Sequence, residues 1–496
     1  MDISRREFLA APSLVALAGA TGASLAAGDG AGAAETAFVA PVAATPTADA
    51  APGHVTRTLA RYVLAARKED LPQNIRREAA RTLLNYMGAA LGGSAHETVD
   101  IALAAMAPFS GPAQATVYGR RQRLDMLHAA LINGISSHVL DYDDTHLRTV
   151  IHPGGPVISA ILALAEHRPV RGDDFINALV LGVEVECRIG NCVYPSHYPR
   201  GWHITGTTGV FGAAAAAGRL MGLNEQQLLW ALGLAATQPV GLQEMFGSMT
   251  KSFHPGRAAQ NGLTAALLAA RNFTCSTQSL EARYGWCNVL SDSRDYREIT
   301  ANLGGRWEIA LNTYKPFACG IVMHPAIDGC IQLRNENHLT AAAIERVDLR
   351  VHHLVLELTG KTAPNTGLEG KFSIYHATAA ALVEGAGGLA QFSDRAVQVP
   401  EIVALRGRVT AAVDPSIKED QVRISVLLRD GRRLEKFVEH AVGSVDRPLP
   451  DDALEAKVEG LAQGILPRDR LRRVMDLCWN MEKSTDAAVL ARSATA

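Results

Sequence analysis

The chain has 496 residues, enough for two to four domains at about 150 residues per domain, so a wholly disordered chain is excluded. Hydrophobic residues make up 48% of the chain and charged residues 20%, which is ordinary globular usage, while aromatic residues are few at 5%. The 48 Lys plus Arg against 50 Asp plus Glu give a net charge of −2, and this balance disfavours a nucleic-acid or membrane-surface role.

The N-terminus has the pattern of an export signal. A pair of arginines, Arg5 and Arg6, stands just before the uncharged, Ala-rich stretch 10–27. This pattern resembles a twin-arginine signal, whose machinery moves proteins that have already folded. An ordinary Sec signal or a membrane anchor is the alternative, but the stretch is weaker than the ~20 strongly apolar residues of a spanning helix. We therefore predict an export signal and flexible leader over residues 1–51, a periplasmic location, and no stable membrane insertion once the signal is cleaved.

Residues 55 to about 310 carry a helical pattern. Apolar residues recur three or four positions apart, as at Leu84, Met87 and Leu91, and no strand-type alternation of comparable length interrupts them. We predict a large all-α bundle domain over residues 52–318.

Two local features add detail to this bundle. Asn224 followed three residues later by Gln227 has the form of a capping box at a helix start. The run 206–220 contains five consecutive alanines, and Ala and Gly leave almost no side chain at a helix contact, so backbones can approach closely. We predict a buried central helix over this run.

The segment after the bundle changes to a mixed pattern. The stretches 347–351 and 422–426 alternate apolar with polar residues, which is typical of half-buried strands. The stretches 324–333 and 375–385 have helical spacing. We predict a smaller α+β domain over residues 319–448.

The tail is predicted to be helical again. Leu471, Val474, Met475 and Cys478 stand at the i, i+3, i+4 and i+7 positions of one helix face. We expect residues 449–496 to form helices that return to the bundle, so the predicted fold class is mainly α.

The seven cysteines are an odd number spread over a large chain, and no pair has zinc-site spacing. We expect buried, reduced thiols, with one disulfide as the alternative. Cys319 lies near the predicted domain junction and could be a nucleophile, but no spacing ties it to a base, so a structural role is favoured.

The first cluster of polar residues is acidic. Asp141, Asp143 and Asp144 lie within four residues at the end of a predicted helix, shortly before His152. Three carboxylates can bind a hard cation, but these do not share one helical face and no Gly-punctuated calcium loop surrounds them, so we predict no metal site. The alternative is an acidic helix end, which the macrodipole disfavours and which a nearby cation such as His152 would relieve.

Three further stretches place cationic residues near predicted helix starts or the domain junction. His203 precedes the small-residue helix, where it could meet an anionic substrate or be a core histidine bonded to a carbonyl. Lys251, His254 and Arg257 lie within seven residues before another helix, which predicts carboxylate binding by Lys251 and Arg257 rather than a solvated basic loop. Lys315 lies at the junction, a preferred place for ligand clefts.

Taken in order, these stretches resemble the motifs of the MmgE/PrpD family, the 2-methylcitrate dehydratase group that also includes cis-aconitate decarboxylase and iminodisuccinate epimerase. The resemblance runs from about His54 to the C-terminus. Its motifs are Ala130–Gly134, Asp141–Thr145, His152–Pro153, Gly201–His203, Lys251–Ala259, Lys315–Phe317 and Phe372–Tyr375. The resemblance implies a helical bundle with a small α+β domain, a homodimer, and one pocket between the domains lined by Asp141, Thr145, His152, His203, Lys251, Lys315 and Tyr375.

The resemblance also implies catalysis without a metal or an organic cofactor. Lys251 and Lys315 would stabilise the charge that develops on a carboxylate when the proton on its α-carbon is removed. His203 or His152 would be the base, and the other histidine or Tyr375 would protonate the departing hydroxyl.

Asp141 would keep a histidine in one tautomer.

The leading prediction is a hydro-lyase acting on a small di- or tricarboxylate such as a 2-methylcitrate-like hydroxy acid. An epimerase or a decarboxylase acting on a similar substrate is the alternative among enzymes. An exported carboxylate-binding protein without catalysis is the alternative from another class.

Overall fold

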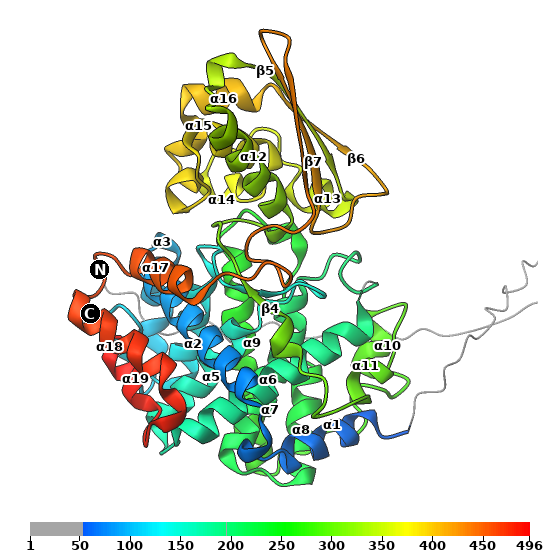
Figure 1. Ribbon diagram of the computed structural model, residues 1–496. Coiled ribbons are helices and arrows are strands. Elements are labelled where there is room, and N and C mark those ends of the chain that lie inside the picture. The colour runs from blue at the N-terminus through cyan, green and yellow to red at the C-terminus, as the bar shows by residue number, and fades with distance from the viewer. Residues whose placement is uncertain (1–52, 195) are drawn as a thin grey trace, which may run out of the picture. The chain divides into compact units, whose positions relative to one another are not determined.

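The computed structural model describes residues 53–194 and 196–496, which lie in one unit. Helices make up most of this unit, and the strands form two short two-stranded sheets and one four-stranded sheet (Figure 1), so the predicted mainly α class is confirmed. None of the described helices combines the length and the apolarity that crossing a bilayer demands. The predicted signal and leader lie outside the described residues, and the predicted domain boundaries, location and homodimer stay predictions.

Helix α7 forms the centre of the helical part. Its residues 204–218 are all buried, and it packs mainly against four neighbouring helices. A Cβ atom added at Gly262 of one neighbour would lie 2.6 Å from the carbonyl oxygen of Val210, so only small residues permit this approach. The predicted buried central helix is confirmed. The five helices are α5 (Gly154–His167), α6 (Gly172–Val193), α7 (Ile204–Met221), α8 (Glu225–Ala236) and α9 (Thr250–Ala270).

A local signal in the sequence sets the start of α8. The side chain of Asn224 accepts a hydrogen bond from the backbone N–H of Gln227, and the side chain of Gln227 accepts one from the backbone N–H of Asn224. The predicted capping box is therefore present. The other helices of this part are α1 (Val55–Ala65), α2 (Gln73–Gly93), α3 (Glu97–Met106), α4 (Met126–His138), α10 (Trp286–Leu290) and α11 (Arg297–Thr300).

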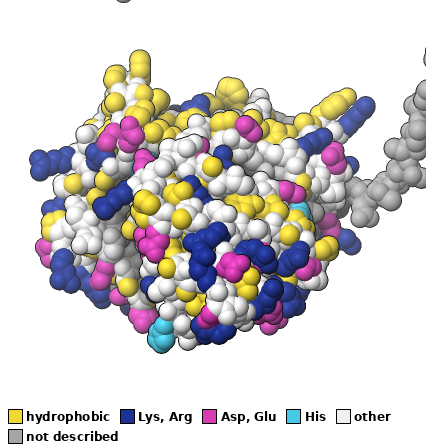
Figure 2. All heavy atoms as spheres, turned by 90° about the horizontal axis from the view of Figure 1, so that it is seen from above, with side chains coloured by type: hydrophobic (Ala, Val, Ile, Leu, Met, Phe, Trp, Pro, Cys, Tyr) yellow, Lys and Arg dark blue, Asp and Glu magenta, His cyan; other side chains and the backbone are white. Residues whose placement is uncertain are grey.

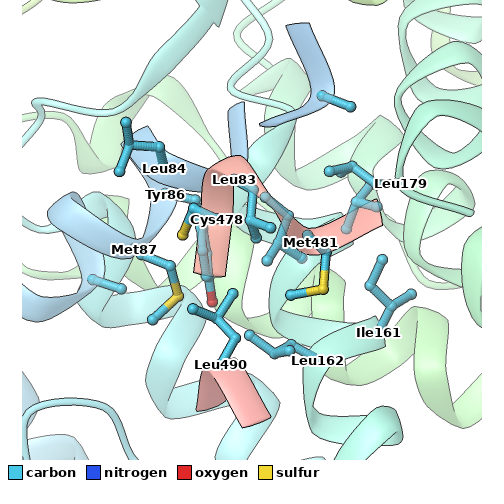
Figure 3. Packing of buried hydrophobic residues seen from close by; sticks show 14 of the residues in the cluster. Leu83, Leu84, Tyr86, Met87, Ile161, Leu162, Leu179, Cys478, Met481 and Leu490 are labelled. Carbon is cyan, nitrogen blue, oxygen red and sulfur yellow. The ribbon is translucent and has the colours of Figure 1, made fainter. Parts of the chain in front are cut away.

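The C-terminal helices pack on this part, as predicted for the tail. Helices α17 and α18 contact α2, α19 contacts α5, and the four apolar residues predicted for one face of α18 are buried. Figure 3 shows Cys478 and Leu490 of the tail among Leu83, Met87 and Leu162 in one hydrophobic cluster. The three helices are α17 (Asp451–Leu461), α18 (Arg468–Trp479) and α19 (Ala488–Ser493).

The predicted strands after residue 344 lie in one four-stranded sheet of order β6-β5-β7-β8. Strands β5 and β6 are parallel, the other two pairs are antiparallel, and β5 and β7 alternate buried with more exposed residues, as predicted. Helices α12 and α15 cover one face (Figure 1). The strands are β5 (Ile344–Val351), β6 (Val409–Val413), β7 (Val422–Leu428) and β8 (Arg433–Val438). The helices are α12 (His324–Asn337), α13 (His353–Thr359), α14 (Gly367–Gly370), α15 (Ile374–Glu384) and α16 (Pro400–Arg406).

Two very short strands join the helical part to the chain that leads into the sheet. Strand β3 (Asp144–His146) pairs antiparallel with β4 (Asn312–Tyr314). The sequence did not predict them, because three residues are too few to show an alternation. Their pairing brings the loop after α4 beside Lys315. A second short pair, β1 (Ala115–Thr116) with β2 (Arg123–Leu124), precedes α4.

Charged side chains are dispersed over the described surface. In the view of Figure 2, Lys and Arg are interspersed with Asp and Glu, with apolar side chains between them. This dispersion agrees with the net charge of −2 and gives this face no field of a single sign.

The cysteines behave as expected. All seven are free, six are buried, and only Cys275 is partly exposed. Burial raises the pKa of the Cys319 thiol well above its ordinary value, so a reactive thiolate is disfavoured there.

Candidate active site

The ends of four helices converge on one place in the helical part. The C-terminal end of α4 meets the N-terminal ends of α5, α7 and α9, and glycines make this possible. A Cβ added at Gly134 of α4 would lie 2.4 Å from the Cα atom of Gly256 of α9. As a result His138, His203 and Lys251, each at or next to a helix end, lie together. Three helix N-termini also favour negative charge at this place.

Asp141 lies between two lysines. Its Oδ2 accepts a hydrogen bond from Lys251 Nζ at 2.7 Å, and its Oδ1 accepts one from Lys315 Nζ. Burial alone raises the pKa of Asp141, but the two ammonium groups outweigh it and hold the pKa well below its ordinary value. We expected Asp141 to hold a histidine, and this was wrong, because lysines occupy both of its oxygens.

Lys251 keeps hydrogen-bonding capacity. An ammonium group has three donors, and Asp141 is the one acceptor that Lys251 Nζ contacts in the described part of the chain. The group lies 5.3 Å from the ring centroid of Phe246 and 5.1 Å from that of Phe372, so aromatic faces flank it. Burial lowers the pKa of Lys251 and Asp141 raises it again, with a net lowering. Its remaining N–H groups are available to an anionic ligand.

Two further buried lysines add positive charge. Lys371 Nζ donates to the carbonyl oxygens of Leu140 and Ala318, and burial lowers its pKa to about 8. Lys457 Nζ donates to the carbonyl oxygen of Lys315 at 2.9 Å, and burial lowers its pKa to about 7. The site is therefore built to receive more negative charge than its own carboxylates supply.

His138 and Asp143 form a dyad that the sequence analysis missed. His138 Nδ1 lies 2.5 Å from Asp143 Oδ2. Burial raises the pKa of Asp143, but His138 and His152 lower it further, so Asp143 is ionised and the Nδ1–H of His138 donates to it. Burial lowers the pKa of His138, which keeps the ring neutral and leaves Nε2 as a basic nitrogen without a partner. Asp143, expected to be only part of a helix end, has the orienting role that we had given to Asp141.

His152 is oriented by its neighbours in the loop. Its Nδ1 lies 2.7 Å from the carbonyl oxygen of Asp144, which can only accept, and 3.2 Å from Thr145 Oγ1. Burial holds the pKa of His152 well below its ordinary value. Thr145, expected to bind substrate, is fully buried behind His152 and supports that ring instead.

His203 pairs with a second histidine. Its Nδ1 lies 2.9 Å from His254 Nδ1, so one ring donates and the other accepts, and its Nε2 has no partner. Burial, His254 and Lys251 together hold the pKa of His203 well below its ordinary value, and burial lowers the pKa of His254 to about 4. Both rings are neutral at physiological pH.

One set of these groups has the composition of a metal site. One ring nitrogen from each of His138, His152 and His203 lies within 4.8 Å of the others. Zinc held at about 2.0–2.1 Å needs ligand nitrogens about 3.4 Å apart, which lies within this limit. The absence of a metal stays a prediction. In a second set, Asp420 and His440 are partly buried and Asp446 is exposed.

The convergent residues enclose a small cavity. Asp141, His152, His203, Lys251 and Lys315 all line it, and its volume is about 30 Å³. A water needs about 10–15 Å³ of such volume, so the cavity holds about two waters and no dicarboxylate. Ligand entry therefore requires a displacement of its walls.

Besides Thr145, two predicted residues do not line this cavity. Tyr375 packs against the hydrophobic cluster under the sheet, and Phe372, three residues earlier, lines the cavity in its place. Arg257 lies six residues after Lys251 on α9, so it points to a different face, where its Nη1 donates to Gln260. The catalytic role of Tyr375 and the binding role of Arg257 therefore find no support in this arrangement and stay predictions.

Two of the missed residues had a signal in the sequence. Lys457 stands on the helix face of Leu454, Val458 and Leu461, all of them buried, and a lysine on such a face is unusual. Lys371 directly precedes the motif that begins at Phe372. His138 gave none beyond ending an apolar helix.

Comparisons with known proteins identify the family of this chain. Residues 57–299 match the MmgE/PrpD N-terminal domain and residues 317–481 match the MmgE/PrpD C-terminal domain. Cis-aconitate decarboxylase of Aspergillus terreus is 26% identical over 465 residues, which cover 88% of this chain and 95% of that protein. Cis-aconitate decarboxylase of Homo sapiens is 25% identical over 456 residues, 88% of this chain and 93% of that protein. 2-Methylcitrate dehydratase of Cupriavidus necator is 24% identical over 366 residues, 67% of this chain and 74% of that protein. Because the two domain matches together span well over half of the sequence, this chain belongs to the MmgE/PrpD family.

Proposed function

We propose that this protein is a cofactor-independent lyase of the dehydratase type that acts on a small di- or tricarboxylate, such as a 2-methylcitrate-like hydroxy acid. The observation that carries the proposal is the juxtaposition of the buried lysines Lys251 and Lys315 with two neutral histidines, His152 and His203, around one cavity. The family's named relatives, a 2-methylcitrate dehydratase and cis-aconitate decarboxylases, are enzymes that act on such acids.

The lysines supply the electrostatic part of the chemistry. A carboxylate of the substrate would accept hydrogen bonds from the free N–H groups of Lys251, while Lys315 and Lys371 add positive charge around it. Loss of the proton on the adjacent carbon moves a second negative charge onto the carboxylate oxygens. Charge fixed in place before the reaction stabilises this state without any reorganisation, and such groups are usually the largest catalytic contribution.

The histidines supply the proton transfers. The Nε2 atom of His138, His152 or His203 takes the α-proton, and the electron pair of the broken C–H bond forms the new C=C bond. The hydroxyl on the neighbouring carbon leaves with a proton from a second group and departs as water. With Tyr375 outside the cavity, the second group is another histidine, after it has taken up a proton, or Lys251.

Decarboxylation is the second candidate, because the cis-aconitate decarboxylases match over 88% of this chain and the dehydratase over 67%. In that reaction the bond from carbon to a carboxylate breaks and carbon dioxide leaves. The electron pair left on carbon then takes a proton from a protonated histidine or Lys251. The same residues therefore serve both reactions.

Proton NMR in deuterated water tests the proposal. The protein, treated with chelator, is incubated with citrate, 2-methylcitrate, cis-aconitate and aspartate, and the variant Lys251→Met serves as the control. A vinyl signal that forms with loss of water supports the dehydratase, and one that forms with loss of carbon dioxide selects the decarboxylase. Deuterium at the α-carbon without net conversion would shift the assignment to an epimerase, and no change in any spectrum would favour a binding protein.

A further inference from the structure

A second, larger cavity adjoins the one around Lys251. Its volume is about 270 Å³, against about 30 Å³ for the cavity around Lys251. Val150, Ile321 and Val322 line both cavities, so these three side chains form the partition between them. Displacing the partition would join a charged space that is too small for the substrate to an open space that is large enough for part of it.

The partition is built from short irregular segments. Val150 has a φ of +53°, in the left-handed region that β-branched residues rarely adopt. Such backbone conformations gather at functional sites, where the surrounding structure enforces them. Ile321 and Val322 belong to a single 3₁₀ turn, Ile321–Met323, and Ile321 is partly exposed. No long helix or strand has to move for these side chains to retract.

The wall of the larger cavity suits an apolar group. Beyond the partition it is lined by Leu147, Pro325 and Val442, among other residues. His324, which also lines it, has its pKa lowered to about 3 by burial and is neutral. Arg148 is the one arginine among the lining residues, and its guanidinium is held by Glu298 at 2.6 Å.

The rim of the larger cavity carries negative charge. Glu419, Asp420 and Asp446 line it. His440 lies beside both aspartates, 3.3 Å from Asp420 and 3.4 Å from Asp446. The lysines lie on the other side of the partition, so a carboxylate in the larger cavity would meet carboxylates and no free cation among the described lining residues.

We propose that the larger cavity receives an uncharged, apolar substituent of the substrate while the substrate's carboxylates lie against Lys251 and Lys315. The inference rests on the proposed function and narrows it to alkyl-substituted di- or tricarboxylates. An apolar cavity of about 150 Å³ accepts benzene, so the larger cavity has room for a chain of about six carbons.

The test uses 2-alkylsuccinates as probes that bind but do not react. Succinate, 2-methylsuccinate, 2-butylsuccinate and 2-hexylsuccinate are titrated into the full chain by calorimetry, together with a hexyl probe that ends in a carboxylate. Each buried methylene should tighten binding about three- to fourfold, so hexylsuccinate, with five more methylenes, should bind roughly 200- to 1,000-fold more tightly than methylsuccinate. The terminal carboxylate should abolish this gain.

Two variants test whether the alkyl group of the probe lies in the larger cavity. Val445 lines the larger cavity and is 41% exposed, so Val445→Trp fills the cavity without disturbing the core. This substitution should weaken the binding of hexylsuccinate at least tenfold and leave the affinity for succinate unchanged. Val413→Trp, at a position 45% exposed and outside both cavities, is the control and should leave every probe unchanged.

The outcomes separate the inference from the function on which it rests. If succinate binds but the affinity for alkylsuccinates does not rise with the length of the alkyl group, the inference about the apolar pocket is wrong and the proposed function is unaffected. If the affinity still rises with alkyl length in Val445→Trp, the inference is also wrong, because the alkyl group would then lie outside the larger cavity. If succinate and every alkylsuccinate fail to bind, the carboxylate site of the proposed function fails and the apolar pocket fails with it.

Discussion

Two buried histidine–carboxylate pairs in this protein use their nitrogens differently. His146 has a partner at both nitrogens, Thr149 Oγ1 at 2.7 Å and Glu308 Oε2 at 3.1 Å. His138 has Asp143 at Nδ1, and its Nε2 has no partner. In the first pair both ring nitrogens are bonded within the fold, whereas in the second pair one ring nitrogen is free to bond a ligand.

The buried cations show the same contrast. Arg188 donates to Glu184 and, among other carbonyls, to those of Ala301 at 2.9 Å and Arg306 at 2.7 Å. Lys251 donates to one carboxylate oxygen and faces a cavity. Residue type and burial are alike in the two regions, so the active site is distinguished by unused donors and acceptors that converge on a cavity.

The largest expected effect comes from Lys251→Met. Removing the ammonium group that faces the substrate should lower kcat by about 10³-fold, since the loss of a single charge-stabilising donor costs about 10²–10³. Thermal unfolding should stay cooperative, because methionine fills most of the space of the lysine side chain. Steady-state kinetics and calorimetry check both, and turnover near normal would remove the central claim.

Matched substitutions of the two histidines separate chemistry from stability. His138→Gln should lower kcat by roughly 10²-fold or more, with little change in the melting temperature. His146→Gln should leave kcat of the folded protein within a few-fold and lower the free energy of unfolding by about 1–3 kcal/mol, since it removes one of the buried hydrogen-bond partners of Glu308. Equal loss of kcat in both variants would contradict the distinction drawn between the two regions.

Asp143→Asn should have an intermediate effect. An asparagine oxygen can still accept from the Nδ1–H of His138, but the negative charge that makes Nε2 more basic is lost. We expect kcat to fall roughly 10–10²-fold, the usual range for groups that orient a functional histidine. Asp143→Ala is the comparison, and an equal effect of both variants would argue that orientation, and not charge, is what Asp143 contributes.

The smallest expected effect is on pH dependence. The folded-state pKa values of about 7 for Lys457 and about 8 for Lys371 lie below the ordinary value, so the site loses positive charge as the pH rises through that range. Carboxylate affinity and kcat/KM should fall in two steps as the pH rises, near pH 7 and near pH 8, each by about tenfold per pH unit at most. The contribution of these lysines to stability has the opposite sign, because the unfolded chain binds more protons between pH 7 and 10 and the free energy of unfolding rises there.

Lys457→Met is the control for this prediction. The variant should lose the first step of the affinity decrease, near pH 7, and keep the second. A pH profile that is unchanged in the variant would exclude Lys457 from ligand binding, and the same profile would then be assigned to Lys371.

Most of the fold could be predicted because its patterns are local. The helical spacing, the capping box at Asn224 and the alternation of β5 and β7 each depend on residues a few positions apart. The sequence motifs also brought Asp141, His152 and Lys251 into one site through their likeness to a family. The three-residue strands β3 and β4 gave no pattern, although they bring Lys315 to that site.

The roles within the site could be predicted less well. Whether a carboxylate beside a helix end faces a lysine or a histidine depends on backbone turns, and Asp141 has a φ of +51°, which no spacing rule indicates. Tyr375 and Phe372 lie in one motif, and the start of α15 decides which of them faces the cavity. Lys457 comes from a helix more than 300 residues beyond His138, so only the tertiary fold brings it there.

The pairing of β3 with β4 ties together residues 168 positions apart. At a synthesis rate of about 5–20 residues per second, Asp141 emerges from the ribosome roughly 10–30 seconds before Lys315, its buried partner, exists. During that interval the acidic loop has at most one of its two lysines and no enclosing wall, and water must solvate its carboxylates. The site is therefore among the last parts of the helical half to become ordered, and any chain that ends before residue 315 has a bundle without a site.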